Sequence, residues 1–337
     1  MNTKLPCFYY PTIATIIDDD SILLENLIAN LSNRISYQEF NNPRKALQFL
    51  QNQQNVAPHS KEFLHTLTDS SEDIDIDQHG RYAVTINLNN IYNKLYDRNR
   101  FNIPSVIIVD HDMPGMKGIE LCRELIDSPI KKIMLTGVTD HKLAIDAFNE
   151  GIIHQFILKD DPHVFESIDK AIFAMQNHYF ADLSETVIKN ITAGTFSYLE
   201  EKKFMDFFWQ FIKDNSIIEF YLIDSIGSFL LLNAKGELVW LIVKSDREIQ
   251  NDYQIAVGQD APKDIIQILS KKQKLLFLFS EDDYKQPPEE WYSYLHQANE
   301  IKNIQGCYYS VIQGENAYKI GGICKNKVFS YSNYLNL

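Results

Sequence analysis

The stretch SVIIVDHDMPGMKG, residues 105–118, combines an apolar run, an acidic end and a turn. The run Ser105–Val109 has the length and the β-branched composition of a buried strand. Asp110 follows this run directly, and a helical pattern of apolar residues extends from Gly118 to Ile126. A buried strand that leads into a helix is the repeating unit of α/β folds.

The same alternation of strand and helix extends to both sides of this stretch. Five strands that alternate with helices predict an α/β domain with a doubly wound, five-stranded parallel sheet. The four further strands are expected at Thr12–Ile17, Ile35–Phe40, Lys132–Leu135 and Ile152–Leu158, and the four further helices at Ser21–Leu31, Pro43–Leu50, His141–Asn149 and from near Pro162.

The spacing between Asp18 and Asp110 is too long for this pattern alone. Two helices, two strands and their loops need about 50 residues, which leaves roughly forty to an insertion at about residues 52–102. Within it Asp69–Asp77 is acidic and turn-rich, Tyr82–Leu88 predicts an extra strand, and Asn90–Asp97 predicts an extra helix. The insertion is either a tolerated surface segment or a surface for a specific partner.

Polar side chains follow four of the expected strands. Asp18 and Asp19 come after the first, Asp110 after the third, Thr136 after the fourth and Lys159 after the fifth. The carboxyl ends of parallel strands meet at one edge of a sheet, where open α/β sheets bind ligands. Three carboxylates there favour Mg²⁺, and a carboxylate nucleophile beside it can accept a phosphoryl group. Each feature alone has a simpler explanation, because a run of aspartates is often a solvated loop or a helix cap.

Four segments resemble the signature blocks of response-regulator receiver domains in two-component systems: IIDDD (16–20), VDHDMPGMKG (109–118), IMLTG (133–137) and FILK (156–159). The resemblance implies a flavodoxin-like sheet with strand order 2-1-3-4-5 and a sensor histidine kinase as partner. It implies that Asp110 is the phosphoacceptor, and that Mg²⁺ is bound by Asp18, Asp19, Asp110 and the backbone carbonyl of Asp112. Thr136 and Phe156 match the switch pair of the family, and Lys159 matches its invariant lysine.

Two departures from the family pattern stand near this site. Members usually carry a proline directly after the lysine, commonly with a cis peptide bond, whereas Asp160 and Asp161 precede Pro162 here. The cis bond is therefore in doubt. Asp112 is anionic and lies two positions after the phosphoacceptor, and we hypothesise that it repels or misplaces attacking water and so affects the phosphoryl lifetime.

The predicted domains are a receiver over residues 1–180, a helical linker over 181–195 and an output domain over 196–337. Apolar residues at helical spacing continue from Phe165 past Tyr179 to Leu183, Val187 and Ile191. This stripe either packs on its own domain or pairs with a second copy, and we expect a homodimer through the final receiver helices.

The output domain is expected to be α+β with an antiparallel sheet. An aromatic helix stripe runs from Phe204 to Ile212, and three strands follow, the last two joined by a hairpin turn at 233–236. The strands are expected at Ile217–Ile223, Ser228–Leu232, Glu237–Val243 and Leu275–Phe279, with a closing meander of Cys307–Ile312, Ala317–Gly321 and Lys327–Tyr331.

Composition limits the functions of the chain. Its 337 residues allow two domains, and a net charge of −13 argues against a broad basic surface for nucleic acid or anionic lipid. The four cysteines form no CxxC pair, which favours reduced thiols. No run approaches the ~18 apolar residues of a spanning helix, so we expect a cytoplasmic protein without membrane contact.

The favoured function is a phosphorylation-controlled switch, not an enzyme, whose output works by protein contact and dimerisation. The whole chain also resembles a subfamily of response regulators with a long receiver insertion that act in quorum sensing, through segments such as MPGMKGIELC and GSFLLLNAKGELVW. Two alternatives stay open for the output domain: direct binding of nucleic acid, and a nucleotide-binding or enzymatic activity.

Overall fold

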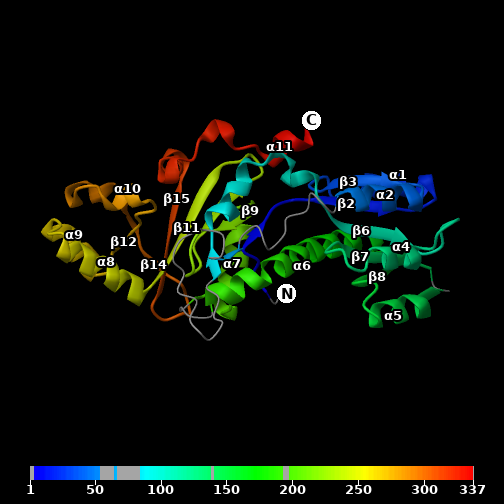
Figure 1. Ribbon diagram of the computed structural model, residues 1–337, viewed down its shortest axis with the longest axis horizontal. Helices are drawn as coiled ribbons and strands as arrows, with labels where there is room; N and C mark the ends of the chain where they lie inside the picture. Colours follow the sequence, from blue (N-terminus) through cyan, green and yellow to red (C-terminus); the bar gives the residue numbers. More distant parts are fainter. Residues whose placement is uncertain (1–3, 54–63, 67–83, 138–139, 193–196, 337) are drawn as a thin grey trace. The chain divides into compact units, whose positions relative to one another are not determined.

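The computed structural model describes residues 4–53, 64–66, 84–137, 140–192 and 197–336 (Figure 1). These residues form two compact units. The first unit contains the described residues of 9–53 and 98–185, and the second contains those of 4–8, 64–97 and 186–336. The chain therefore passes between the two units several times.

The first unit is built on a five-stranded parallel sheet with the order β3-β2-β6-β7-β8. Counted along the chain within this sheet, the order is 2-1-3-4-5, which confirms the predicted doubly wound topology. Its strands are β2 (Ile13–Ile17), β3 (Ser36–Phe40), β6 (Pro104–Asp110), β7 (Lys131–Thr136) and β8 (Gln155–Leu158).

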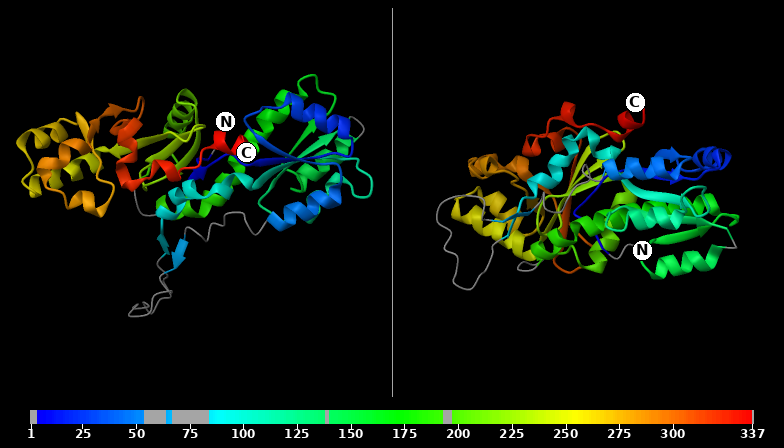
Figure 2. Two further views of the ribbon diagram at one scale, coloured as in Figure 1. Left: turned by 90° about the horizontal axis from the view of Figure 1, so that it is seen from above. Right: turned by 45° about the vertical axis from the view of Figure 1, so that its right-hand side comes forward.

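Helices cover both faces of this sheet (Figure 2). Alternate residues of a strand point to opposite faces, so β6 contributes Ile107 and Val109 to one core and Val106 and Ile108 to the other. The first core contains residues of α2 (Pro43–Gln53), α4 (Gly118–Glu124) and α5 (His141–Asn149), and the second contains residues of α1 (Ser21–Asn30) and α6 (Val164–Thr192).

The second unit contains a six-stranded sheet with the order β1-β9-β10-β11-β15-β14. From β9 to β14 every pair is antiparallel, which confirms the expected antiparallel sheet. The aromatic stripe of α7 (Lys202–Asp214) packs on it, with the Phe208 ring 5.1 Å from Phe220 and 4.5 Å from Phe229. The strands are β1 (Phe8–Tyr9), β9 (Ile217–Leu222), β10 (Phe229–Asn233), β11 (Leu238–Ser245), β14 (Asn299–Glu300) and β15 (Cys307–Gln313).

A smaller core lies between β11 and β14 in the sequence. It joins α8 (Asp246–Gly258) and α9 (Lys263–Ser270) to the paired strands β12 (Lys274–Leu276) and β13 (Leu295–Gln297), around the buried Trp291. The strand expected at Leu275–Phe279 is therefore present but ends earlier. A short helix, α10 (Glu281–Tyr284), follows β12.

The insertion contributes to the second unit, which the predicted boundaries did not include. β4 (Leu64–Thr66) pairs antiparallel with β5 (Val84–Ile86), and the expected helix corresponds to α3 (Asn89–Tyr92) with the 3₁₀ turn η3 (Asn93–Tyr96). The Tyr92 ring lies 5.8 Å from Phe279 of the second unit. Arg98–Asn102 form another turn, η4, in the first unit, and the acidic stretch 69–77 lies outside the described residues.

The end of the chain differs from the expected meander. Only Cys307–Ile312 belongs to a strand, β15; the stretches 317–321 and 327–331 do not. Gly321 and Gly322 have φ values of +62° and +64°, so their backbone is left-handed and not the extended backbone of a regular strand. The elements at the end of the chain are the 3₁₀ turns η7 (Gly314–Tyr318), η8 (Ile320–Gly322) and η9 (Lys325–Lys327) and the final helix α11 (Tyr331–Leu335). A further 3₁₀ turn, η6 (Pro288–Tyr294), precedes β13.

The expected helical linker is the continuation of α6, which passes without interruption from the first unit into the second and ends at Thr192. Val187 is fully buried and Ile191 is 8% exposed, so both pack within the chain itself. In the part of the chain that the structure describes, no helix is long and apolar enough to cross a membrane.

Candidate functional site

The carboxyl ends of β2 and β6 place three aspartates side by side. The two strands are neighbours in the sheet, with Ile17 opposite Val109, so the residues that follow Ile17 come level with Asp110. Asp18 stays in line with the strands because its N–H donates to the Phe40 carbonyl at 3.1 Å. Asp20 has a different role, since its carboxylate caps α1. The helix-cap explanation of the aspartate run thus applies to Asp20 alone.

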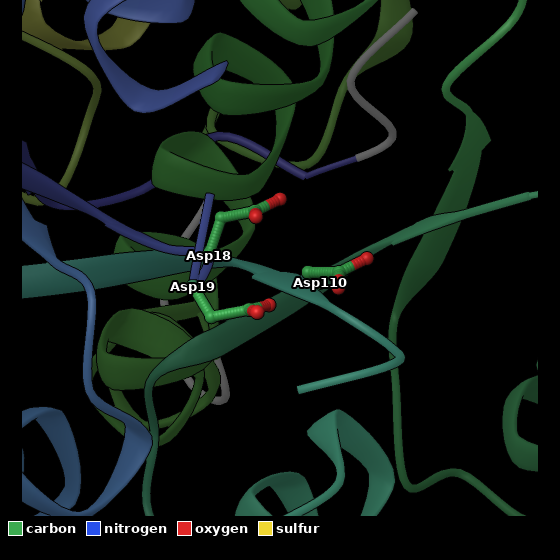
Figure 3. A group of neighbouring side chains, drawn as sticks. All are labelled: Asp18, Asp19 and Asp110. Atoms are coloured by element: carbon green, nitrogen blue, oxygen red, sulfur yellow. The ribbon is translucent and has the colours of Figure 1, made fainter. Parts of the chain in front are cut away.

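The carboxylates of Asp18, Asp19 and Asp110 form one cluster (Figure 3). Each offers one oxygen, and these three oxygens lie within 4.8 Å of one another. Asp18 is 1% exposed and Asp110 is 7% exposed, whereas Asp19 faces solvent. Among the described residues this is the one group of three or more acidic, histidine or cysteine side chains close enough to share a metal ion.

Lys159 is paired with two of these carboxylates. It follows β8, where its N–H donates to the Thr136 carbonyl at 3.0 Å. Its Nζ lies 2.7 Å from Asp18 Oδ2 and 2.9 Å from Asp110 Oδ1. Burial alone would lower the pKa of Lys159, but the hydrogen bonds to the two aspartates outweigh it and the pKa is raised. For Asp18 burial is the stronger effect, and its pKa is raised despite the bond to Lys159.

The two residues of the predicted switch pair lie on adjacent strands. Thr136 ends β7 and is fully buried, and its hydroxyl donates to the Gly137 carbonyl at 3.2 Å. Phe156 on β8 is half-buried and packs against the core beneath α2, α4 and α5. Its ring centroid lies 5.3 Å from that of His141 at the start of α5.

Asp112 is in contact with Asp110 through its backbone. Its N–H donates to Asp110 Oδ2 at 3.1 Å, which fixes the turn after β6. The exposed Asp112 side chain pairs with Lys117, and this hydrogen bond lowers the pKa of the carboxyl. Lys117 is not among the predicted site residues, because the two residues meet across a turn whose conformation no periodic pattern encodes.

Gly118 is a second residue whose role the sequence argument missed. A Cβ atom at this position would stand 2.1 Å from the carbonyl oxygen of Asp110. The Gly118 N–H also donates to the His111 carbonyl at 2.9 Å. The first residue of α4 therefore packs directly on the backbone of the expected phosphoacceptor, and only glycine fits there.

No cis peptide bond occurs among the described residues, so the segment from Lys159 to Pro162 is trans throughout. Asp161 accepts a hydrogen bond from the N–H of His163 at the start of α6. The two extra aspartates thus belong to the turn that leads into this helix.

Comparison with known proteins agrees with this geometry. The family profile described as response regulator receiver domain matches residues 78–169. The solved structure of the Legionella pneumophila response regulator LqsR is 30% identical, and the match covers 100% of this chain and 97% of that chain with a TM-score of 0.80. The chain belongs to the response regulator family. Its first unit is accordingly the receiver unit of this response regulator.

A shorter match involves the hydrogenase transcriptional regulatory protein HoxA of Cupriavidus necator, which is 35% identical over 74 residues. The matched segment spans 21% of this response regulator and 15% of that protein. The receiver profile likewise begins at residue 78, so Asp18 and Asp19 lie outside the matched range. In the structure both residues nevertheless lie beside Asp110, because β2 and β6 are adjacent strands.

Proposed function

We propose that this response regulator is switched by transfer of a phosphoryl group from a sensor histidine kinase to Asp110. The observation that carries the proposal is the meeting of three carboxylates and Lys159 at the carboxyl ends of three strands. Buried carboxylates repel one another unless cations neutralise them. Such a cluster is costly for stability alone and suited to an anionic ligand that arrives with a metal ion.

The donor set fits Mg²⁺. Asp18, Asp19 and Asp110 supply only oxygen atoms, which Mg²⁺ prefers, and one of the three faces solvent, where the ion and its waters have room. The backbone carbonyl of Asp112 is the fourth proposed ligand, as the resemblance to receivers implies. When bound, Mg²⁺ would neutralise the carboxylates and the oxygens of the incoming phosphoryl group.

The protein residues then have separate tasks. A carboxylate oxygen of Asp110 attacks phosphorus, forming the O–P bond while the P–N bond to the kinase histidine breaks and that imidazole retains the electron pair. Lys159 already contacts Asp110 and can hold the transferred phosphoryl oxygens by its charge. The Thr136 hydroxyl exchanges the Gly137 carbonyl for a phosphoryl oxygen, and Phe156 follows the movement of β7.

The test is labelling of the full chain by a small phosphodonor such as radioactive acetyl phosphate with Mg²⁺. The wild-type protein should incorporate a hydroxylamine-labile label, and Asp110→Asn should incorporate none. Asp206→Asn, on the exposed face of α7, is the matched control and should be labelled like the wild type. Labelling of Asp110→Asn at the wild-type level would exclude Asp110 as the acceptor.

We further propose that phosphorylation raises the dimer fraction through α6, that the output acts by protein contact without an enzymatic activity, and that the protein serves quorum sensing in the cytoplasm. The resemblance of the whole chain to quorum-sensing regulators supports the last point. Val187 and Ile191 are buried in the protomer, so a dimer would use exposed residues of α6 such as Phe173, which is 53% exposed. Sedimentation velocity with and without phosphodonor tests this, and an unchanged distribution in fully labelled protein would refute dimerisation.

A further inference from the structure

The Asp112 side chain starts from backbone that is already part of the phosphorylation site. Its N–H donates to Asp110 Oδ2 at 3.1 Å, and its carbonyl is the fourth proposed ligand of Mg²⁺. The Asp112 carboxylate nevertheless does not belong to the group of three carboxylates whose oxygens lie within 4.8 Å of one another. A fourth carboxylate is therefore attached next to the cluster without joining it.

Lys117 is the residue that holds this carboxylate. The Lys117 ammonium and the Asp112 carboxylate form an ion pair across the turn after β6, and both side chains are more than half exposed. The backbone that carries Lys117 is fixed by two hydrogen bonds. The Lys117 N–H donates to Glu120 Oε2 at 3.0 Å, and the next N–H, that of Gly118, donates to the His111 carbonyl at 2.9 Å. Fixed geometry favours an exposed ion pair, because fewer side-chain conformations are lost when the pair forms.

The ion pair also affects the charge around the cluster. The three clustered carboxylates carry three negative charges, and Lys159 compensates one of them. One divalent cation would neutralise the two that remain. Asp112 adds a further negative charge, which Lys117 cancels, so the closed ion pair leaves this balance unchanged.

A free Asp112 carboxylate would change which cation the site prefers. Mg²⁺ requires near-octahedral coordination and keeps several water ligands, whereas Ca²⁺ accepts a larger number of oxygen ligands in flexible arrangements. A fourth carboxylate therefore stabilises bound Ca²⁺ more than bound Mg²⁺. It would also take a place on the cation that an oxygen of the phosphoryl group needs.

We propose that Lys117 sets the cation preference of this site by keeping the Asp112 carboxylate out of the aspartate cluster. Lys117 is a positioning residue, because it acts on the cation only through Asp112. The closed ion pair favours Mg²⁺ and leaves room for the phosphoryl group. This inference rests on the proposed function, since it concerns the metal site that the phosphoryl transfer would use.

The test measures the binding of MgCl₂ or CaCl₂ alone to the unphosphorylated full chain. The chemical shifts of backbone amides in NMR spectra follow the titration at constant ionic strength. Lys117→Met removes the ammonium and keeps an unbranched side chain. We expect this variant to bind Ca²⁺ roughly ten-fold more tightly than the wild type and Mg²⁺ only about two-fold more tightly. One further unit charge attracts both ions, but only Ca²⁺ accepts the extra ligand readily.

Three further variants distinguish the ion pair from the mere loss of a surface charge. Lys117→Arg keeps a cation that can pair with Asp112, so it should bind both ions like the wild type. Lys117→Met/Asp112→Asn removes both partners and should return the ratio of the Ca²⁺ and Mg²⁺ affinities to the wild-type value. Lys170→Met is the matched control, because it removes an exposed lysine that pairs with Glu166 on α6. It should leave both affinities unchanged.

The possible results distinguish the two proposals. A wild-type protein that binds neither cation would refute the metal site on which the proposed function depends, and the role of Lys117 with it. If the wild type binds Mg²⁺ and Lys117→Met has the same ratio of affinities, the role of Lys117 is overturned and the metal site stands. A changed ratio that persists in Lys117→Met/Asp112→Asn would also overturn this role, because Asp112 would then not be the added ligand.

Discussion

Replacing Lys159 with methionine should destabilise the receiver unit strongly and make its stability depend on pH. Lys159 Nζ contacts carboxylates of Asp18 and Asp110 at 2.7 and 2.9 Å, and the Asp18 carboxylate is almost fully buried. At these distances each attraction amounts to about 6 kcal/mol at an effective dielectric constant of ~20, before the cost of desolvation. Removing one partner of a buried pair costs about 3–5 kcal/mol, and the 30% exposure of the Lys159 side chain favours the lower end.

The pH dependence follows from the two carboxylates that remain. Without Lys159, burial and mutual repulsion raise the pKa of Asp18 further than burial already does in the wild type. A carboxyl group whose folded pKa lies above its unfolded value contributes stability at low pH, and this contribution is lost as the pH rises through the folded pKa. The variant should therefore lose more stability at pH 8 than at pH 5, and Mg²⁺ should restore part of it.

Urea unfolding at both pH values, with and without Mg²⁺, measures this effect. Lys170→Met is the matched control, since Lys170 forms an exposed i,i+4 pair with Glu166 and its replacement should change the stability only slightly. The electrostatic reasoning would be contradicted if Lys159→Met lost no more stability than this control, or if it lost the same amount of stability at both pH values.

Three further predictions concern single residues of the receiver unit. Gly118→Ala should cost about 1–3 kcal/mol in urea unfolding and slow phosphorylation, because its Cβ would stand 2.1 Å from the Asp110 carbonyl oxygen. Gly258→Ala is the control and should be tolerated, because there is open space around its Cβ; equal losses of stability in the two variants would refute the close approach at Gly118. Thr15→Val should stabilise the protein by about 1 kcal/mol, because the buried Thr15 hydroxyl has no hydrogen-bond partner among the described residues. A loss of stability in this variant would show that the hydroxyl does have a partner. Asp112→Asn should shorten the lifetime of the labelled protein by removing a charge that repels attacking water, and identical dephosphorylation rates would discard that hypothesis.

The sequence predicted the receiver fold and the carboxylate cluster because both depend on strong, repeated patterns. Buried parallel strands carry continuous apolar runs, and their carboxyl ends must meet, so Asp18, Asp19, Asp110 and Lys159 follow from strand order alone. Lys117 and Gly118 could not be found in this way. Their roles depend on the turn after β6, where one residue bonds Asp112 and the other packs on the backbone of Asp110.

Non-local pairing accounts for the other differences. The two-residue strand β1 has no periodicity, so its pairing with β9, more than two hundred positions later in the chain, left no pattern to detect. The stretch Ala317–Gly321 was predicted to be a strand, but Gly321 is left-handed and a Cβ there would meet the Phe279 ring at 2.6 Å. Local composition did not encode either of these contacts.

The division of the second unit among three stretches of sequence has a consequence for the evolution and the engineering of this protein. A cut anywhere between residues 186 and 197 removes β1 and α3 from the fragment that keeps β9. Such a fragment would carry an unfinished sheet, with the backbone of β9 open to self-association. Replacing one half of this protein with the corresponding half of another regulator would separate β1 and α3 from β9. We therefore expect the two halves to evolve together.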